Sequence, residues 1–461
     1  MKKTLARITA AALGCMMLAS CGAQNSANSG KVELSVGNWP STEGKDLDTK
    51  NALKDAFEKE YPNIAIVPDT WSFDLQTFYP KAEAGLLPNY YTAHFSEMPK
   101  LIDGEYVYDI TKALDDNGYS GMNENIKKVV SKDDAIYALP TLVYTLGIVY
   151  NTDMFEAAGL VDEDGTPHQP KDWNEMAEMA VKIKEVTGKP GMAITTSNNT
   201  GGWIFTNMAW SYGVDFMEQD ADGKWKATFN TPEMEEALQF ISDLKWKYDV
   251  LPANVLVDQD ELRKTFATGG AGMIISAPDA AALSKFDMDP KMFGMMAIPS
   301  GPKRRVSLMG GTLNCVSNTS SPEQADAFVK WMDFGGSGLR FDDTVKSNME
   351  STYQTNAENG QAIGAKSFRI WGDDSDKVKY EDELIDKYYN MKPNAAKLYN
   401  ESFSDPSIEL QAEEPVCAQD LYSILDTCIQ QVLDNKDADI KTIIEKANTD
   451  FQTNYLDNID Y

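Results

Sequence analysis

Two hydrophobic periodicities alternate over residues 31–93, and this alternation constrains the fold more than any other feature of the chain. Residues 31–38 carry an apolar side chain at every second position, which is the pattern of a strand. Apolar residues at helical spacing follow over 53–61, and a second strand-like run starts at 64–68. A third short strand is predicted at 90–93, after another helix. Strands that alternate with helices favour a sheet covered by helices, so the predicted fold class is α/β.

The chain length predicts more than one core. The sequence has 461 residues, whereas a single hydrophobic core stops growing near roughly 250 to 300 residues. Later segments carry helix boundaries of their own: Asp172 caps a predicted helix that Gly188 ends, and Thr231 begins another with Pro232 at its first position. The stretch 338–461 is predicted to be mostly helical. We therefore expect two α/β lobes.

The charge balance excludes some classes of partner. The chain has 71 Asp and Glu against 42 Lys and Arg, a formal net charge of −29. A nucleic acid needs clustered Lys and Arg to neutralise its phosphates, so we expect no nucleic-acid partner. An acidic surface also repels polyanions, which favours a neutral ligand.

The first thirty residues are typical of an exported, lipid-anchored protein. Residues 1–20 combine early positive charges with a short apolar run, which indicates a signal peptide and not a membrane span. The run 18–22 (LASCG) resembles the bacterial lipobox, whose cysteine receives the lipid; here that residue is Cys21. Residues 21–30 are small and polar and are predicted to form a flexible tether. The expected location is the extracellular face of the cell membrane.

No pattern in the sequence indicates catalysis or a metal. A nucleophile elbow, a phosphate-binding loop and an HExxH zinc motif are all missing from the sequence, and it contains only two histidines. Cys315, Cys417 and Cys428 match no metal or redox spacing, and the last two are expected in the core of a helix. We therefore predict no enzyme, no cofactor and no metal site, although composition alone does not exclude a pair of carboxylates for glycoside hydrolysis.

Aromatic residues are the main candidates for binding. Nine Trp, twenty Tyr and eighteen Phe are present, and flat aromatic faces stack on the apolar side of a sugar ring while Asp, Glu and Asn bond its hydroxyls. Three tryptophans inside predicted helices are expected in the core: Trp173, Trp246 and Trp331. Five lie at or near predicted element ends and are candidates for a ligand site: Trp39, Trp71, Trp203, Trp210 and Trp371.

An ordered series of motifs resembles one protein family. The segments 137–140 (YALP), 147–160 (GIVYNTDMFEAAGL) and 170–176 (PKDWNEM) are similar to a run found in bacterial extracellular solute-binding proteins of family 1, the receptors of carbohydrate ABC importers. Further landmarks of that family match 57–64, 266–273, 298–302, and 310–311 followed by 320–325. The resemblance covers most of the chain from residue 31 to about 334.

The resemblance implies a two-lobed, periplasmic-binding-protein-like fold of type II. Each lobe would be a sheet flanked by helices, and the lobes would be joined by hinge crossovers near Val143–Gly147 and Leu308–Thr312, with a third crossover in the tail. Lobe 1 would comprise 31–144 and 311–345, and lobe 2 would comprise 145–310 and 346–461.

The resemblance also implies a set of ligand-facing residues. Carried over by position, they are Trp39, Phe95, Ser96, Glu97, Tyr144, Trp203, Asp279, Gly311 and Thr312; Trp71 and Trp210 are added as aromatic candidates. One departure matters: members that bind maltodextrin-like ligands often have Gly-Pro-Trp where this chain has Ala277-Pro278-Asp279, so a stacking platform is replaced by an acid.

The resulting hypothesis is a monomeric, lipid-anchored substrate-binding subunit of an ABC importer, which captures a carbohydrate, expected to be a neutral oligosaccharide, and delivers it to the permease. Two alternatives stay open. The same fold could bind a polyamine, a peptide or another organic solute, because Glu97 and Asp279 suit a cation. The other alternative is that the chain is a secreted glycan-degrading enzyme.

Overall fold

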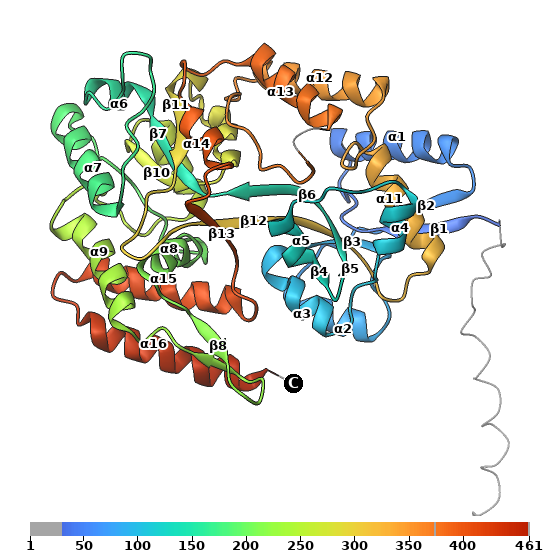
Figure 1. Ribbon diagram of the computed structural model, residues 1–461, viewed down its shortest axis with the longest axis horizontal. Helices are drawn as coiled ribbons and strands as arrows, with labels where there is room; N and C mark the ends of the chain where they lie inside the picture. The colour runs from blue at the N-terminus through green and yellow to red at the C-terminus, as the bar shows by residue number, and fades with distance from the viewer. Residues whose placement is uncertain (1–29, 373–374, 460–461) are drawn as a thin grey trace, which may run out of the picture.

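The computed structural model describes residues 30–372 and 375–459, so the predicted signal peptide, Cys21 and all of the tether except Gly30 lie outside the described residues. The first elements are β1 (Val32–Val36), α1 (Lys45–Glu60), β2 (Ile64–Pro68), α2 (Leu75–Glu83) and β3 (Tyr90–His94). The predicted alternation is confirmed. The chain forms two bodies that β6 (Ala138–Thr145) and β12 (Arg305–Val316) join across the middle of the molecule (Figure 1).

Lobe 1 is the body that contains β1, β2 and β3. These strands run parallel, and β12 joins them antiparallel to β3 in a sheet of order β13-β12-β3-β1-β2. The other elements of this lobe are η1 (Phe95–Glu97), α3 (Met98–Asp103), α4 (Thr111–Asp116), α5 (Glu124–Val130), α11 (Pro322–Phe334) and a separate two-stranded sheet of β4 (Ser131–Lys132) and β5 (Ala135–Ile136). A capping box at Ser321 begins α11, and its buried face packs on β1 and α1 through Phe328 and Trp331.

Lobe 2 is the body that contains β7 (Gly147–Asn151), β10 (Met273–Ser276) and β11 (Phe293–Ala297). These strands form an antiparallel sheet of order β10-β7-β11, and every residue of the three strands is buried. The other elements between the hinge strands are α6 (Thr152–Ala157), α7 (Trp173–Thr187), α8 (Thr200–Tyr212), β8 (Met217–Gln219), β9 (Trp225–Ala227), α9 (Pro232–Trp246), α10 (Gln259–Ala267), η2 (Pro278–Phe286) and η3 (Pro290–Met292). The predicted caps at Asp172 and Thr231 and the left-handed stop at Gly188 are confirmed.

The C-terminal part is mostly helical, as predicted, but it contains one strand. Its elements are α12 (Asp343–Glu358), α13 (Asp376–Tyr388), α14 (Lys397–Ser402), β13 (Ile408–Ala412), α15 (Ala418–Asp434), α16 (Ile440–Asn454) and η4 (Leu456–Asn458). Helices α15 and α16 pack against α8 and α9 in lobe 2 (Figure 1). The prediction that both late cysteines lie inside a helix is corrected for one: Cys428 is buried in α15, whereas Cys417 is half-buried and precedes that helix in a left-handed conformation.

Strand β12 connects the two lobes. One of its edges pairs with β6, and its other edge pairs first with β13 at residues 305–309 and then with β3 at residues 312–316. The side chain of Asn207 on α8 also bonds this strand: its Oδ1 accepts from the Leu308 N–H at 2.5 Å and its Nδ2 donates to the Val306 carbonyl at 3.1 Å. The amide of Asn207 thereby fixes α8 to the hinge strand. The residue ranges given above for the two lobes stay a prediction.

No helix in the described residues is long and apolar enough to cross a membrane.

Candidate functional site

The carboxyl end of β3 carries lobe 1 residues to the hinge. His94 pairs with Thr312 of β12, and the next residues, Phe95, Ser96 and Glu97, form the buried turn η1. Strands of an α/β sheet present ligand-binding loops at their carboxyl ends, so η1 lies where a site is expected. The hinge strand approaches this turn closely, because a Cβ at Gly311 would lie 2.7 Å from the Phe95 ring and 2.1 Å from the Leu142 carbonyl oxygen.

In lobe 2, α8 and α15 approach each other closely near the beginning of α8. A Cβ at Gly202 would lie 2.2 Å from the Tyr422 carbonyl oxygen, so only glycine fits there. The buried carboxylate of Asp426 on α15 accepts from the backbone N–H groups of Asn199 and Gly202, both at 2.7 Å, and so caps α8 from the neighbouring helix. Because of this packing, Trp203 on α8 and Tyr422 on α15 lie close together.

Glu413 joins the two lobes. It lies directly after β13, and its carboxylate accepts a hydrogen bond from the Tyr422 hydroxyl at 3.0 Å. The Ser96 backbone N–H of lobe 1 and the Trp203 side chain of lobe 2 lie near the same carboxylate and stabilise its charged form. We call the following residues the interlobe cluster: Ser96, Glu97, Tyr144, Trp203, Glu413 and Tyr422.

Two aromatic rings of the interlobe cluster are partly exposed. Tyr144 lies on β6, and its ring meets that of Trp203 edge to face, with centroids 6.3 Å apart and planes at 84°. Both side chains pack against the lobe 2 core and are half-buried, so part of each stays accessible. A partly exposed aromatic face beside a hydrogen-bonding carboxyl group is suited to a sugar ring, which has one apolar side and a polar rim.

Burial shifts the acids of this region toward their protonated forms. Burial, together with the nearby Glu97, raises the pKa of Glu413 to about 7, although Tyr422, Ser96 and Trp203 act in the opposite direction. Burial likewise raises the pKa of Glu97 and of Asp420 on α15, and the positive charge of Lys100 opposes both shifts. Near neutral pH, Glu413 can therefore donate as well as accept a hydrogen bond.

Several predicted candidates lie elsewhere. Trp39 is 4% exposed and stacks on Trp331 in the lobe 1 core, with ring centroids 6.3 Å apart. Trp210 is fully buried, and its indole N–H donates to Glu414 at 2.8 Å. In this structure neither ring is free to stack on a ligand, because each is enclosed by its own core.

The remaining candidates are divided. Trp71 is half-buried beside Phe78 and Tyr91, at the same end of the lobe 1 sheet as η1. Thr312 is half-buried in β12. Asp279 belongs to η2, but its side chain lies outside the described residues.

Sequence reasoning missed Glu413 and Tyr422. One signal could have found Glu413, because the pair Glu413-Glu414 directly follows the strand pattern of 408–412. The predicted set as a whole stays a prediction.

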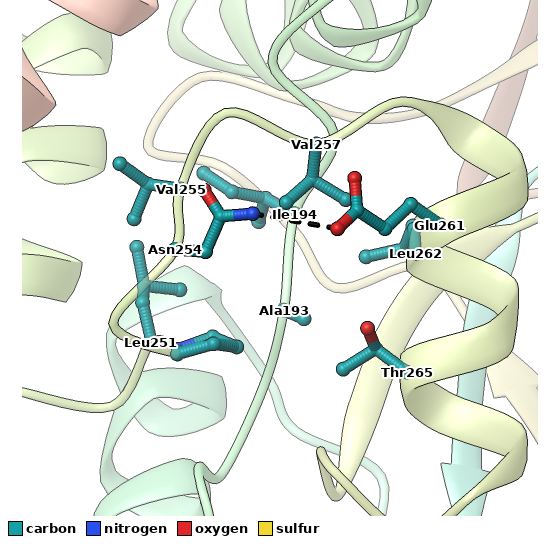
Figure 2. Close-up of a pocket in the computed structure, with 10 residues that line it drawn as sticks. Ala193, Ile194, Leu251, Asn254, Val255, Val257, Glu261, Leu262 and Thr265 are labelled. Atoms are coloured by element: carbon teal, nitrogen blue, oxygen red, sulfur yellow. Dashed lines mark hydrogen bonds between the residues drawn. The ribbon is translucent and has the colours of Figure 1, made fainter.

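The alternatives to this region as a functional site would be a metal site and a small pocket in lobe 2. Within residues 30–372 and 375–459, no group of three or more His, Cys, Asp or Glu could hold a metal ion. A pocket between the 251–257 segment and α10 has a volume of only about 60 Å³ and is lined largely by apolar residues (Figure 2). Its rim includes the hydrogen bond from Asn254 to Glu261 at 3.4 Å. Ligand pockets usually measure roughly 300 to 1,000 Å³, so this one is too small for a sugar.

The two lobes, the hinge strands and the interlobe cluster define a receptor fold that encloses a solute between its lobes. The family model of bacterial extracellular solute-binding proteins matches residues 41–332, and the chain belongs to this family. The family prediction and the two-lobed fold are therefore confirmed.

Individual relatives differ in what their names say they bind. The chain is 22% identical over 349 residues to the arabinooligosaccharide-binding protein of Bacillus subtilis. That alignment covers 70% of this chain and 75% of the Bacillus protein. It is 25% identical over 329 residues to the sn-glycerol-3-phosphate-binding periplasmic protein of Pectobacterium atrosepticum, covering 68% and 70% respectively. The solved cyclic alpha-maltosyl-1,6-maltose binding protein of Arthrobacter globiformis superposes with a TM-score of 0.65 at 21% identity, over 91% of this chain and 98% of that one.

Proposed function

We propose that this chain captures a neutral oligosaccharide at the interlobe cluster and delivers it to the permease of an ABC importer. The observation that carries the proposal is the meeting of two half-buried aromatic rings, Tyr144 and Trp203, with the Glu413 carboxyl group. The rings supply stacking faces, and the carboxyl group supplies polar contacts for ring hydroxyls. Two relatives whose names specify an oligosaccharide support the same ligand class.

Capture would work by closure of the lobes. Ser96 belongs to lobe 1 and Trp203 to lobe 2, so a ligand at Glu413 contacts both lobes only when they are close together. A shift from 1:99 to 99:1 in favour of the closed form needs a ligand that binds that form about 10⁴-fold more tightly. The closed form is what the permease would recognise.

The proposal includes a monomeric chain held at the extracellular face of the membrane by a lipid on Cys21. The lipobox-like run 18–22 supports it. The Cys21→Ala chain is expected to lose incorporation of labelled palmitate and to move from the membrane fraction to the medium. Unchanged labelling would refute the anchor without affecting the binding proposal.

A second candidate ligand is an organic cation such as a polyamine. Glu97 is buried beside Glu413, and Asp420 adds a third acid, so this part of the site is rich in carboxyl groups. The same acids disfavour a phosphorylated ligand such as sn-glycerol 3-phosphate.

A thermal-shift screen of the chain lacking residues 1–21 separates these ligands. A ligand at 100 times its dissociation constant stabilises the native state by about 2.7 kcal/mol. We expect a rise in melting temperature with maltotetraose or arabinotriose, and none with sn-glycerol 3-phosphate. A rise with spermidine or peptides alone would refute the sugar proposal. If either oligosaccharide is shortened on incubation with the protein, the result would instead favour a glycan-degrading enzyme.

A further inference from the structure

A large open cavity, lined by none of the interlobe cluster residues, lies against the hinge strand β6. Its volume is about 800 Å³, and it is bounded by β6, by the loop that follows α11, and by α12 and α13. In Figure 1, α12 and α13 lie above β6, whereas α3 and α15 lie below the hinge strands. The volume lies within the range of roughly 300 to 1,000 Å³ that small-molecule sites occupy.

Three aromatic side chains line the cavity and are partly exposed: Phe341, Tyr353 and Trp371. The Trp371 ring is held in place, because it meets Tyr119 edge to face with centroids 5.1 Å apart and its backbone bridges Met122. Tyr353 is also fixed, since its hydroxyl donates to Glu381 at 3.2 Å. The cavity therefore has rigid aromatic faces that no core covers completely.

Each charged residue that lines the cavity already has a partner. Arg369 pairs with Glu381 and with Asp382. Lys377 donates to the carbonyl oxygens of Gly336 and Gly338, at 2.7 and 2.5 Å, and Asp376 lies 4.0 Å from the Lys379 ammonium group. An ionic ligand at Arg369 would have to break its pairs with Glu381 and Asp382. The exposed Asp376–Lys379 contact contributes little. The cavity is consequently suited to a neutral ligand.

Uncharged polar side chains complete the wall: Thr141, Ser337, Asn348, Thr352, Ser367 and Ser375. Hydroxyl and amide groups both donate and accept hydrogen bonds, as sugar hydroxyls do. From this combination we infer that the cavity is a second binding site, separate from the interlobe cluster, for a neutral sugar or polyol. The inference does not depend on the proposed function, because the cavity shares no residue with the interlobe cluster.

The position of the cavity gives the second site a consequence. Thr141, Leu142 and Val143 of β6 line it, and the next residue along the strand is Tyr144 of the interlobe cluster. A ligand in the cavity therefore contacts the strand that positions a cluster ring, and the two sites share one hinge element.

Fluorine NMR of the full-length chain labelled with 5-fluorotryptophan tests the inference. The chain has nine tryptophans, so the Trp371 and Trp203 signals can be assigned from Trp371→Phe and Trp203→Phe variants. The probes are maltose, mannobiose and D-mannitol. At least one of them is expected to shift the Trp371 signal saturably, with a dissociation constant of about 1 mM or tighter. The same shift is expected in the Trp203→Phe and Glu413→Gln variants, because the interlobe cluster is not needed for it.

Matched variants on α12 complete the test. Thr352→Trp places a large side chain in the cavity and is expected to weaken the probe response at least tenfold. Gln354→Trp, on the same helix but outside the cavity wall, is expected to leave it unchanged. A Trp371 signal that no probe moves overturns the inference. A Trp371 signal that moves in the unsubstituted chain but not in the Trp203→Phe and Glu413→Gln variants also overturns the inference, since the shift then reports closure of the lobes. If the probes move the Trp371 signal but not the Trp203 signal, the result bears only on the proposed function.

Discussion

The carboxyl group of Glu413 makes the stability of the protein depend on pH in a direction that can be measured. Burial raises its pKa in the folded state from the ordinary 4.5 to about 7. The folded state therefore holds this proton more tightly than the unfolded chain does. The stabilisation is complete below about pH 4.5 and is lost as the pH rises through about 7.

The size of the effect follows from the same two values. At 1.36 kcal/mol for each pKa unit, the difference between 4.5 and about 7 corresponds to about 3 kcal/mol in full. Between about pH 5 and about pH 7.5 the loss is roughly 2 kcal/mol, because part of it has already occurred at the lower pH. Glu413→Gln keeps the shape of the side chain and removes the ionisation.

The assay is urea unfolding of the ligand-free protein at the two pH values. The free energy of unfolding of the unsubstituted chain is expected to fall by roughly 2 kcal/mol more than that of Glu413→Gln. Glu401→Gln, which changes an exposed carboxylate on α14, is the matched control and should follow the unsubstituted chain. Equal pH dependence in all three proteins would refute the reasoning that Glu413 is protonated in the folded state near neutral pH.

Four further outcomes are expected. Trp203→Ala should weaken binding of the oligosaccharide more than about tenfold in isothermal titration, because a stacking face is lost; unchanged affinity would remove it from the site. Gly202→Ala places a Cβ 2.2 Å from the Tyr422 carbonyl oxygen and should destabilise the fold by about 1–3 kcal/mol, so an unchanged melting temperature would show that α8 and α15 separate easily. Asp426→Ala removes the cap of α8 and should cost about 1–2 kcal/mol in chemical unfolding, and no loss would mean that water replaces it. Asn207→Leu leaves the Leu308 N–H and the Val306 carbonyl of β12 without their side-chain partner and should cost about 1–3 kcal/mol for each; hydrogen exchange at the Leu308 amide that stays as slow as before would contradict this.

Local features of the fold could be predicted from the sequence because they depend on near neighbours. The caps at Asp172 and Thr231 bond backbone groups only three residues away, so their signatures are complete within a short window. The strands of lobe 1 carry their alternation in the same way. Family landmarks then placed the crossovers near β6 and β12.

The candidate site was harder to predict, because its contacts join distant parts of the chain. Asn199 and Asp426 are 227 residues apart, and nothing local to either residue indicates the other. The position of Trp39 after a strand suggested a binding role, but its ring turns toward Trp331, and that choice depends on where α11 packs. Glu413 becomes notable only once Ser96 and Trp203 are known to meet it.

Strand β12 sets a limit on how the lobes can move. Its backbone is bonded on one edge to β6 and on the other first to β13 and then to β3, so it has paired neighbours along its whole length. A wide swing would have to break part of this ladder, whereas a change in its twist keeps the bonds intact. We therefore expect the lobes to open and close by a change in the twist of β12, without local unfolding. Such a motion should occur on the microsecond to millisecond scale of collective domain motions.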